Sequence, residues 1–130
     1  MDEHFGEHFM LDGYGGDEHI LDDRDVVLRS LEDILVVLDM HKLADPVVYR
    51  AEGNDVKDPG GWSGFVIIME SHISIHTFPK RGFVSIDAYT CKAGLNTKAI
   101  RAYFTGVFNL KDSEVNFVKR GTQYPNQNLY

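Results

Sequence analysis

The sequence predicts an α/β (α+β) fold, a two-layer sandwich in which an antiparallel sheet carries two main helices on one face. The chain has 130 residues, enough for one domain (1–130) with a modest core. Two segments place apolar residues at helical three- and four-residue steps, and the other apolar segments are shorter and extended. Because two helices cover only one face of such a sheet, the other face must be shielded or solvated, and we expect a dimer.

Both predicted helices begin at a polar residue suited to capping. Asp22 or Asp23 caps the first helix, which runs to about residue 39, and Asn96 or Thr97 caps the second, which runs to about residue 108. Their inner faces consist of apolar side chains at helical spacing: Val27, Leu28, Leu31, Ile34, Leu35 and Leu38, and then Ile100, Tyr103, Phe104 and Val107.

Extended segments account for most of the remaining chain. We expect strands at residues 5–14, 46–51, 63–70, 71–77, 83–91 and 113–119. A polar loop rich in Gly, Asn, Asp and Pro spans residues 52–61, and a turn spans residues 79–82.

The composition excludes several classes of function. A net charge of −7 argues against nucleic-acid binding, because that affinity comes mainly from neutralising phosphates. The acidic first residues do not resemble a signal peptide, and no apolar run approaches the ~20 residues of a membrane span. One cysteine cannot form an internal disulfide, so we expect a reducing, cytoplasmic location.

The most informative segment is the run Glu70-Ser71-His72-Ile73-Ser74-Ile75-His76-Thr77-Phe78-Pro79. In an extended strand His72, Ser74 and His76 share one face, and the residues between them share the other. Polar groups that lose water need partners. A strand face that carries two histidines and a serine is therefore expected to border solvent, an interface or a site.

Three blocks of the chain resemble the small bacterial and archaeal S-adenosylmethionine decarboxylase proenzymes, at that family's spacing. The blocks are Glu70-Ser71-His72, Ile75-His76-Thr77-Phe78-Pro79 and Asp87-Ala88-Tyr89-Thr90-Cys91. Further matches are Ser63-Gly64 with the apolar strand after it, Gly6-Glu7-His8-Phe9, and Lys119-Arg120-Gly121. The resemblance covers nearly the whole chain, and one motif explains serine, histidine and cysteine residues that would carry little information singly.

The resemblance implies that the chain cuts itself between Glu70 and Ser71, giving a β chain of residues 1–70 and an α chain of residues 71–130. The hydroxyl of Ser71 would attack the carbonyl of Glu70, and elimination of the resulting ester would leave a pyruvoyl group as a built-in cofactor. His76 is the candidate proton acceptor in this processing. Ser63 is the candidate donor that stabilises the oxyanion.

The resemblance also implies the reaction of the processed enzyme. The substrate amine would form a Schiff base with the pyruvoyl ketone, and CO2 would leave while the conjugated amide accepts the electrons. Cys91 is the candidate general acid that reprotonates the product. The family pattern implies a homodimer of processed protomers, with sites near its interface, that acts in polyamine (spermidine) biosynthesis.

The remaining histidines have simpler interpretations. His72, His76 and Cys91 lack the spacing of a common structural zinc site, so we expect no metal. His8 has either a role in the site or a structural role. The other histidines are expected at the surface: His4, His19 and His41.

Two departures from the family pattern concern the substrate. Lys80 stands where members that use S-adenosylmethionine carry a glutamate that binds the ribose hydroxyls, and lysine offers donors only. The 52–61 loop, with Lys57 at the ungapped position, stands where those members carry a phenylalanine that stacks on adenine. Tyr49 and Trp62 are the candidate replacements for that phenylalanine. The family's run of glycine and acidic residues after the cysteine is also changed.

S-adenosylmethionine remains the expected substrate, because most of the family uses it. L-ornithine and L-arginine are the alternatives, since relatives decarboxylate them by the same pyruvoyl chemistry without a nucleoside pocket. A third hypothesis is a catalytically silent, dimeric regulatory relative. The joint retention of Ser71, His76 and Cys91 argues against it, because a silent protein does not need all three.

Overall fold

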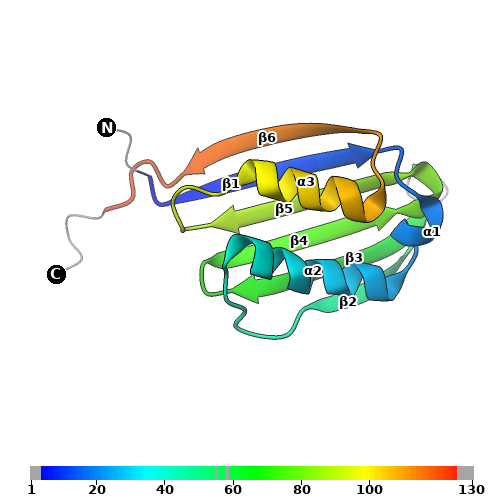
Figure 1. Cartoon of the computed structure of the whole chain (residues 1–130), viewed down its shortest axis with the longest axis horizontal. Helices are drawn as coiled ribbons and strands as arrows, with labels where there is room; N and C mark the ends of the chain where they lie inside the picture. Colours follow the sequence, from blue (N-terminus) through cyan, green and yellow to red (C-terminus); the bar gives the residue numbers. More distant parts are fainter. Residues whose placement is uncertain (1–3, 55, 58, 126–130) are drawn as a thin grey trace.

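The computed structural model describes residues 4–54, 56–57 and 59–125. Six strands form one antiparallel sheet in the order β2-β3-β4-β5-β1-β6, and the helices lie on one of its faces (Figure 1). The strands are β1 Gly6–Tyr14, β2 Val47–Glu52, β3 Gly60–Ile68, β4 Ser71–Phe78, β5 Phe83–Thr90 and β6 Asp112–Arg120. The predicted two-layer sandwich is confirmed.

The two main helices, α2 (Arg24–Leu38) and α3 (Thr97–Phe108), begin at predicted caps. The Asp23 carboxylate accepts hydrogen bonds from the first-turn N–H groups of α2, and the Asn96 side chain does the same for α3. A third helix, α1 (Glu18–Leu21), has only four residues and was not predicted. None of the helices in the described part of the chain has the length and apolar content that a membrane span requires.

The core lies between the helices and the sheet. On β4 the side chains of Ile73 and Ile75 are buried in this core, whereas His72 and Ser74 are half-buried and His76 is exposed on the opposite side. The alternation predicted for this strand is therefore confirmed. Other core residues come from every layer: Phe9, Leu11, Leu31, Ile34, Val66, Ile86, Ile100, Phe104 and Phe108.

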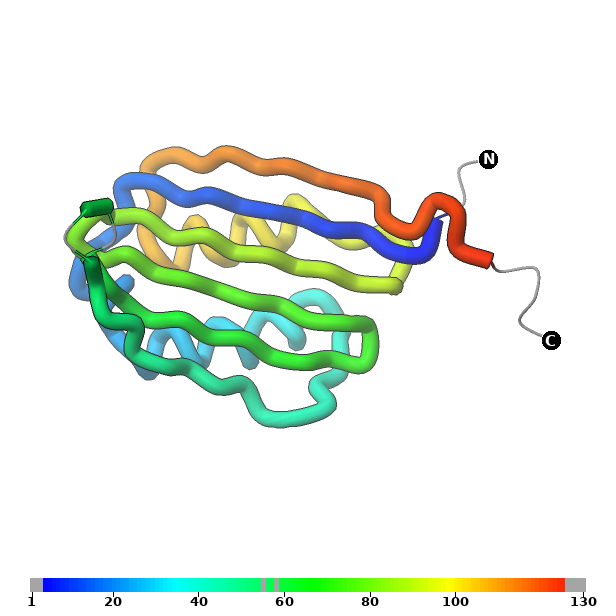
Figure 2. Tube along the Cα trace, turned by 180° about the vertical axis from the view of Figure 1, so that it is seen from behind, coloured from blue at the N-terminus to red at the C-terminus, as the bar shows by residue number. Residues whose placement is uncertain are grey.

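The second face of the sheet carries no helix of the described chain, as the view from behind shows (Figure 2). We call it the open face; among others it carries the side chains of His8, Ser63, Phe65, His72, His76, Asp87 and Tyr89. The close approach of β3 to β4 requires a glycine at the start of β3. A Cβ on Gly61 would lie 1.9 Å from the carbonyl oxygen of Thr77. Two residues further along β3, Ser63 lies directly opposite His76 in the strand register.

Candidate active site

Ser71 is the first residue of β4, directly after the tight turn that joins this strand to β3. Its φ of 147° lies in a region that residues with a side chain avoid, at a cost of about 1–3 kcal/mol. The backbone N–H of Cys91 donates a 2.8 Å hydrogen bond to the carbonyl oxygen of Glu70. The bond predicted to break is thus next to a strained residue, and its carbonyl already has a donor.

The Glu70 side chain is held by the segment that follows α2. Its Oε1 accepts a 3.4 Å hydrogen bond from the His41 N–H, and its Oε2 lies 3.7 Å from His41 Nδ1. The Met69 N–H donates to the His41 carbonyl at 2.9 Å. These bonds fix both residues of the turn before Ser71. The His41 side chain itself is 68 % exposed, as predicted.

Cys91 lies beside this turn, at the end of β5. Its neighbour Thr90 pairs with Ser71 in the register between β4 and β5. The thiol is free and exposed, so it is accessible to a substrate and able to transfer a proton. The structure therefore brings together Glu70, Ser71 and Cys91, three of the residues predicted from the sequence.

Ser63 and His76 form a second pair on the open face. The Ser63 Oγ lies 2.8 Å from His76 Nδ1, and the two residues oppose each other across β3 and β4. A hydroxyl in hydrogen-bond contact with an imidazole is the arrangement expected of a proton donor and acceptor that act together. The remaining two predicted processing residues are thus also adjacent.

The two pairs do not meet within one chain. Ser71 and His76 are five residues apart on one extended strand, a separation of about 16 Å at the usual rise per residue. His76 and Ser63 therefore cannot contact the bond between Glu70 and Ser71 of their own chain. The predicted processing residues form two half-sites at different positions along β4.

Polar side chains on β1, β4 and β5 continue the open face between these half-sites. His8 Nε2 lies 3.1 Å from Asp87 Oδ1. The Tyr89 ring lies between two histidines, with centroid distances of 5.6 Å to His72 and 6.1 Å to His8. Within the described residues, no group of three or more His, Cys, Asp or Glu side chains is arranged to hold a metal ion.

The three residues expected near the substrate lie in different environments. Tyr49 is 64 % exposed and lies opposite Ser63 in the strand register, on the open face. Trp62 packs against the core on the helix side of the sheet, so it does not share a face with His76. Lys80 is exposed, in the short 3-10 helix η1 (Pro79–Arg81).

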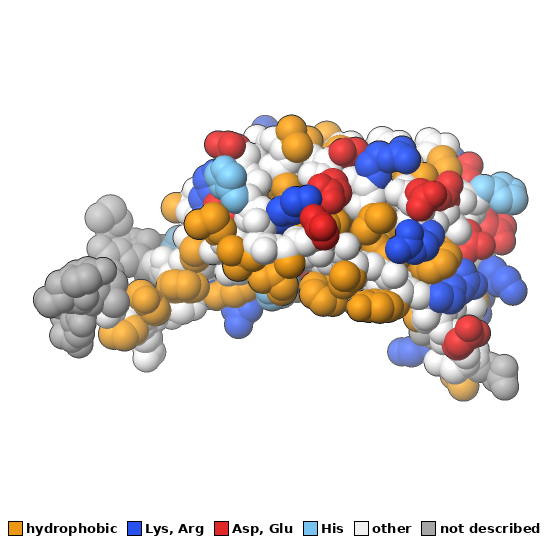
Figure 3. Space-filling model, turned by 90° about the horizontal axis from the view of Figure 1, so that it is seen from below, with side chains coloured by type: hydrophobic (Ala, Val, Ile, Leu, Met, Phe, Trp, Pro, Cys, Tyr) orange, Lys and Arg blue, Asp and Glu red, His pale blue; other side chains and the backbone are white. Residues whose placement is uncertain are grey.

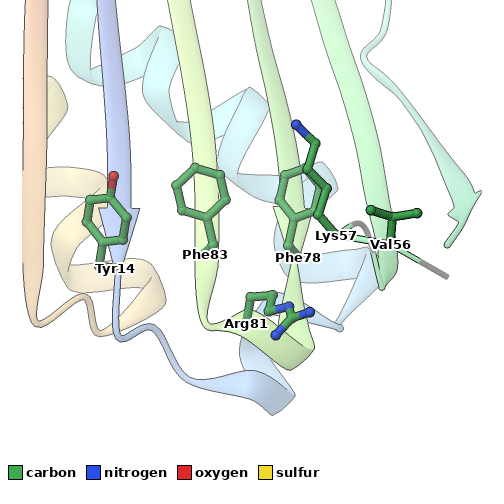
Figure 4. A pocket seen from close by; sticks show the side chains of 6 residues that line it. All are labelled: Tyr14, Val56, Lys57, Phe78, Arg81 and Phe83. Atoms are coloured by element: carbon green, nitrogen blue, oxygen red, sulfur yellow. The ribbon is translucent and has the colours of Figure 1, made fainter. Parts of the chain in front are cut away.

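A pocket of about 630 Å³ lies at the end of the open face, two residues beyond His76 along β4 (Figure 4). Three aromatic rings from neighbouring strands form a row in it, with centroid distances of 5.4 Å between Tyr14 and Phe83 and between Phe78 and Phe83. The lining consists of Tyr14, Val56, Lys57, Phe78, Arg81 and Phe83. Its shape and aromatic wall suit a planar, mainly apolar group.

The aromatic row was not predicted from the sequence as a group. Phe78 and Phe83 stand on either side of the predicted turn, so their pairing follows from the hairpin. Tyr14 joins them only because β1 lies next to β5 in the sheet. That neighbour relation depends on the tertiary fold, and the sequence pattern alone carries no signal for it.

Comparison with known proteins identifies the family of the chain. A model of the S-adenosylmethionine decarboxylase family matches residues 7–121, which include all six strands apart from the first residue of β1. The chain belongs to the S-adenosylmethionine decarboxylase family. A proenzyme of this family from Thermoanaerobacter sp. (strain X514) is 34% identical over 120 residues, covering 89% of this chain and 88% of the relative.

Other members of the S-adenosylmethionine decarboxylase family match to a similar extent. The proenzyme from Thermococcus kodakarensis is 31% identical over 121 residues, covering 93% of this chain and 80% of the relative. The crystal structure of the adenosylmethionine decarboxylase from Aquifex aeolicus superposes with a TM-score of 0.75 at 31% identity, covering 92% of each chain. Family and fold therefore agree.

Proposed function

We propose that this chain is a self-processing, pyruvoyl-dependent decarboxylase that acts on S-adenosylmethionine in polyamine biosynthesis. The observation that carries the proposal is the 2.8 Å hydrogen bond from the Cys91 N–H to the Glu70 carbonyl, next to the strained Ser71. It occurs in a chain whose relatives are decarboxylase proenzymes. The sequence has a single cysteine, which cannot form an internal disulfide, and this supports a cytoplasmic location.

In processing, the Ser71 Oγ bonds to the Glu70 carbonyl carbon and the amide C–N bond breaks, which converts the amide into an ester. The Cys91 N–H stabilises the negative charge that develops on the carbonyl oxygen, a role that the sequence assigned to Ser63. Removal of the Ser71 α-proton then breaks the bond between Cβ and Oγ of Ser71, which releases the chain of residues 1–70 as a carboxylate and leaves dehydroalanine at the start of the second chain. Hydrolysis of the remaining dehydroalanine leaves the pyruvoyl group and ammonia.

The base for this elimination comes from a second copy of the chain. His76 and Ser63 are about 16 Å from Ser71 in their own chain, by the strand rise, and both face away from the helices. The open face also exposes apolar side chains at Tyr49 (64 %), Phe65 (42 %) and Ile67 (41 %). In the view along the β2 edge, hydrophobic side chains gather on the side away from the helices (Figure 3).

A two-fold dimer through the open faces would complete both half-sites at once. Each chain would supply Ser71 and Cys91 to one site, and Ser63 and His76 to the other. The apolar side chains would gain a partner surface. The polar side chains of the open face, which include His8 and Asp87, would lie between the sheets of the two chains.

In the processed enzyme, the pyruvoyl group would supply a ketone that binds the substrate amine and accepts the electron pair left behind when CO2 departs. Residues of this chain orient the substrate and move protons around that group. The exposed Cys91 thiol lies beside Ser71 and donates the proton that completes the product. His76 and Ser63 of the second copy border the same centre.

The pocket beyond His76 favours S-adenosylmethionine over the basic amino acids. The terminal group of S-adenosylmethionine is a neutral adenosine, whose flat base fits the aromatic row and can accept hydrogen bonds from Lys57 and Arg81. L-ornithine and L-arginine end in a cation, which these two side chains would repel. Lys80 is exposed in η1 and is not among the residues that line this pocket.

Intact-mass spectrometry of the purified protein tests the processing step. We expect two chains, of residues 1–70 and 71–130, with a pyruvoyl group at the start of the second. A Ser71→Ala variant should remain one chain, and a Ser74→Ala variant on the same strand should process normally. An uncut parent chain after long incubation would overturn the proposal and would favour the hypothesis of a catalytically silent relative.

Release of labelled CO2 from S-adenosylmethionine, L-ornithine and L-arginine tests the substrate. We expect turnover with S-adenosylmethionine and little with the other two. Turnover with L-ornithine or L-arginine alone would move the assignment to those substrates and leave the processing mechanism in place.

A further inference from the structure

The loop of residues 91–96 joins β5 to α3 and begins with Cys91. Most of this loop is exposed, yet it is held at both ends by charged side chains. At the start of the loop, the Lys92 backbone N–H donates a 2.9 Å hydrogen bond to Oγ1 of the buried Thr90. The loop therefore has a defined position relative to the sheet end where Ser71 lies.

Lys92 ties the loop to the end of α2. Its Nζ donates a 3.0 Å hydrogen bond to the backbone carbonyl oxygen of Asp39. Asp39 is the C-terminal cap of α2, with a left-handed φ of 54°. Carbonyls at a helix C-terminus lack helical partners and carry partial negative charge, so an ammonium group is well suited to them. Lys92 stands in the segment after the cysteine that departs from the family pattern.

Glu7 ties the other end of the loop to β1. Its side chain is buried, with the whole residue 8 % exposed. Oε1 accepts a 3.0 Å hydrogen bond from the Leu95 N–H, and Oε2 lies 3.0 Å from His4 Nε2. The prediction that His4 is a surface residue was wrong, because its side chain is only 16 % exposed and packs beside this carboxylate.

We propose that Lys92 and Glu7 are positioning residues, which hold the 91–96 loop so that the Cys91 N–H points at the Glu70 carbonyl and the Cys91 side chain stays at the sheet end where Ser71 lies. This inference rests on the proposed function. Lys92 follows Cys91 directly, so displacement of its side chain from α2 would move the Cys91 peptide group. Glu7 limits the same movement from the far end of the loop. Neither side chain touches the reacting atoms.

A Lys92→Met variant tests the proposal, because it keeps the aliphatic stem and removes the charge and donors. We expect the newly synthesised precursor to cleave about 10-fold more slowly, since small displacements of reacting groups have effects of this size or larger. Lys92→Arg should restore the rate to within about threefold, because its guanidinium also donates to carbonyls. Lys98→Met, on the exposed first turn of α3, is the matched control and should cleave like the parent.

A second readout reports on the thiol. If the general acid is displaced, protonation falls on the carbon that came from the pyruvoyl group. Hydrolysis then releases the rest of the decarboxylated substrate as an aldehyde and leaves its nitrogen on the protein, so α chains accumulate that start with alanine in place of the pyruvoyl group. We expect this fraction, measured by intact mass per turnover, to rise in Lys92→Met and in Glu7→Leu. Glu7→Gln should behave nearly like the parent, because its amide oxygen still accepts from Leu95.

Two outcomes separate this inference from the proposed function. If the parent cleaves and turns over, but Lys92→Met and Glu7→Leu equal the Lys98→Met control in both readouts, the positioning roles are wrong and the decarboxylase assignment stands. If the parent itself does not cleave, the proposed function fails first. Should Glu7→Leu not fold, the comparison of Lys92→Met with Lys92→Arg decides alone, since Lys92 is a surface residue.

Discussion

The backbone nitrogen of Cys91 lies 2.8 Å from the carbonyl oxygen of Glu70 and donates a hydrogen bond to it. The bond joins the residue expected to act in turnover to the peptide expected to break in processing. Under the proposed function, Cys91 would contribute in two ways. Its backbone N–H would act on the precursor, and its thiol would act on the substrate of the processed enzyme.

A Cys91→Ala variant should therefore cleave at nearly the parent rate, because alanine keeps the backbone N–H. Its turnover should fall by about 100-fold or more, the usual contribution of a positioned general acid. Intact mass follows cleavage, and CO2 release follows turnover. Normal turnover in this variant would refute the general-acid role of the thiol, and an uncut variant would show that the thiol is needed in processing.

Two inactive variants should complement each other if the site is shared between chains. Ser71→Ala and His76→Ala should each remain uncut alone. Co-expressed with different tags, they should yield cleavage of the His76→Ala chains only. Activity should return to roughly a quarter of the parent level, since half of randomly assorted dimers are mixed and each holds one complete site.

The matched control for complementation pairs Ser71→Ala with Cys91→Ala. Both changes lie in the same half-site, so neither site of a mixed dimer would be complete in turnover. We expect no recovery of activity above the level of Cys91→Ala alone. Recovery equal to that of the first pair would contradict the division of the site into these two halves.

Most of the fold could be predicted from the sequence because its signals are local. The caps Asp23 and Asn96 and the alternation along residues 71–77 each depend on neighbours a few residues away, and each is confirmed. The helix α1 (Glu18–Leu21) was missed because four residues show no period. The order of the strands could not be predicted from local sequence patterns, because the position of β1 between β5 and β6 is set only when the sheet folds.

The residues of the candidate site were predicted from local motifs, whereas their arrangement depends on the fold. The motif named Ser71, His76 and Cys91, and the register places Cys91 beside Ser71. Because Ser71 and His76 lie on one predicted strand, the sequence already implied that they are far apart within a chain. It did not show whether Ser71 of one chain meets His76 of a second copy. The loop contacts of Lys92 were also hidden, because Asp39 is 53 residues away in sequence.

Phe83→Leu tests the aromatic row as the site of the adenosine group. Phe83 lies in the middle of the row, within 5.4 Å of both Tyr14 and Phe78. Stacking of a base on an aromatic side chain contributes about 1–3 kcal/mol, so KM for S-adenosylmethionine should rise about 10-fold while kcat changes little. Steady-state CO2 release measures both constants. An unchanged KM would place the nucleoside elsewhere, with Tyr49 as the next candidate.

Asp12→Asn should stabilise the fold at neutral pH. Burial raises the pKa of the Asp12 carboxyl above 3.8, and the nearby carboxylates of Glu114 and Asp87 raise it further. The folded state therefore holds the Asp12 proton more tightly than the unfolded state. The free energy of unfolding consequently falls as pH rises from below 3.8 through the raised pKa of Asp12. Asparagine removes this loss, and because much of the group stays near solvent, screening keeps the gain below about 1 kcal/mol.

Thermal unfolding of the uncut Ser71→Ala chain measures this effect without interference from cleavage. The additional Asp12→Asn change should raise Tm at pH 7. It should leave Tm nearly unchanged at pH 3, where Asp12 is protonated in both the folded and the unfolded state. An equal rise in Tm at both pH values would mean that the amide gains new contacts. The rise would then not come from removing a carboxylate that burial, Glu114 and Asp87 make costly to ionise.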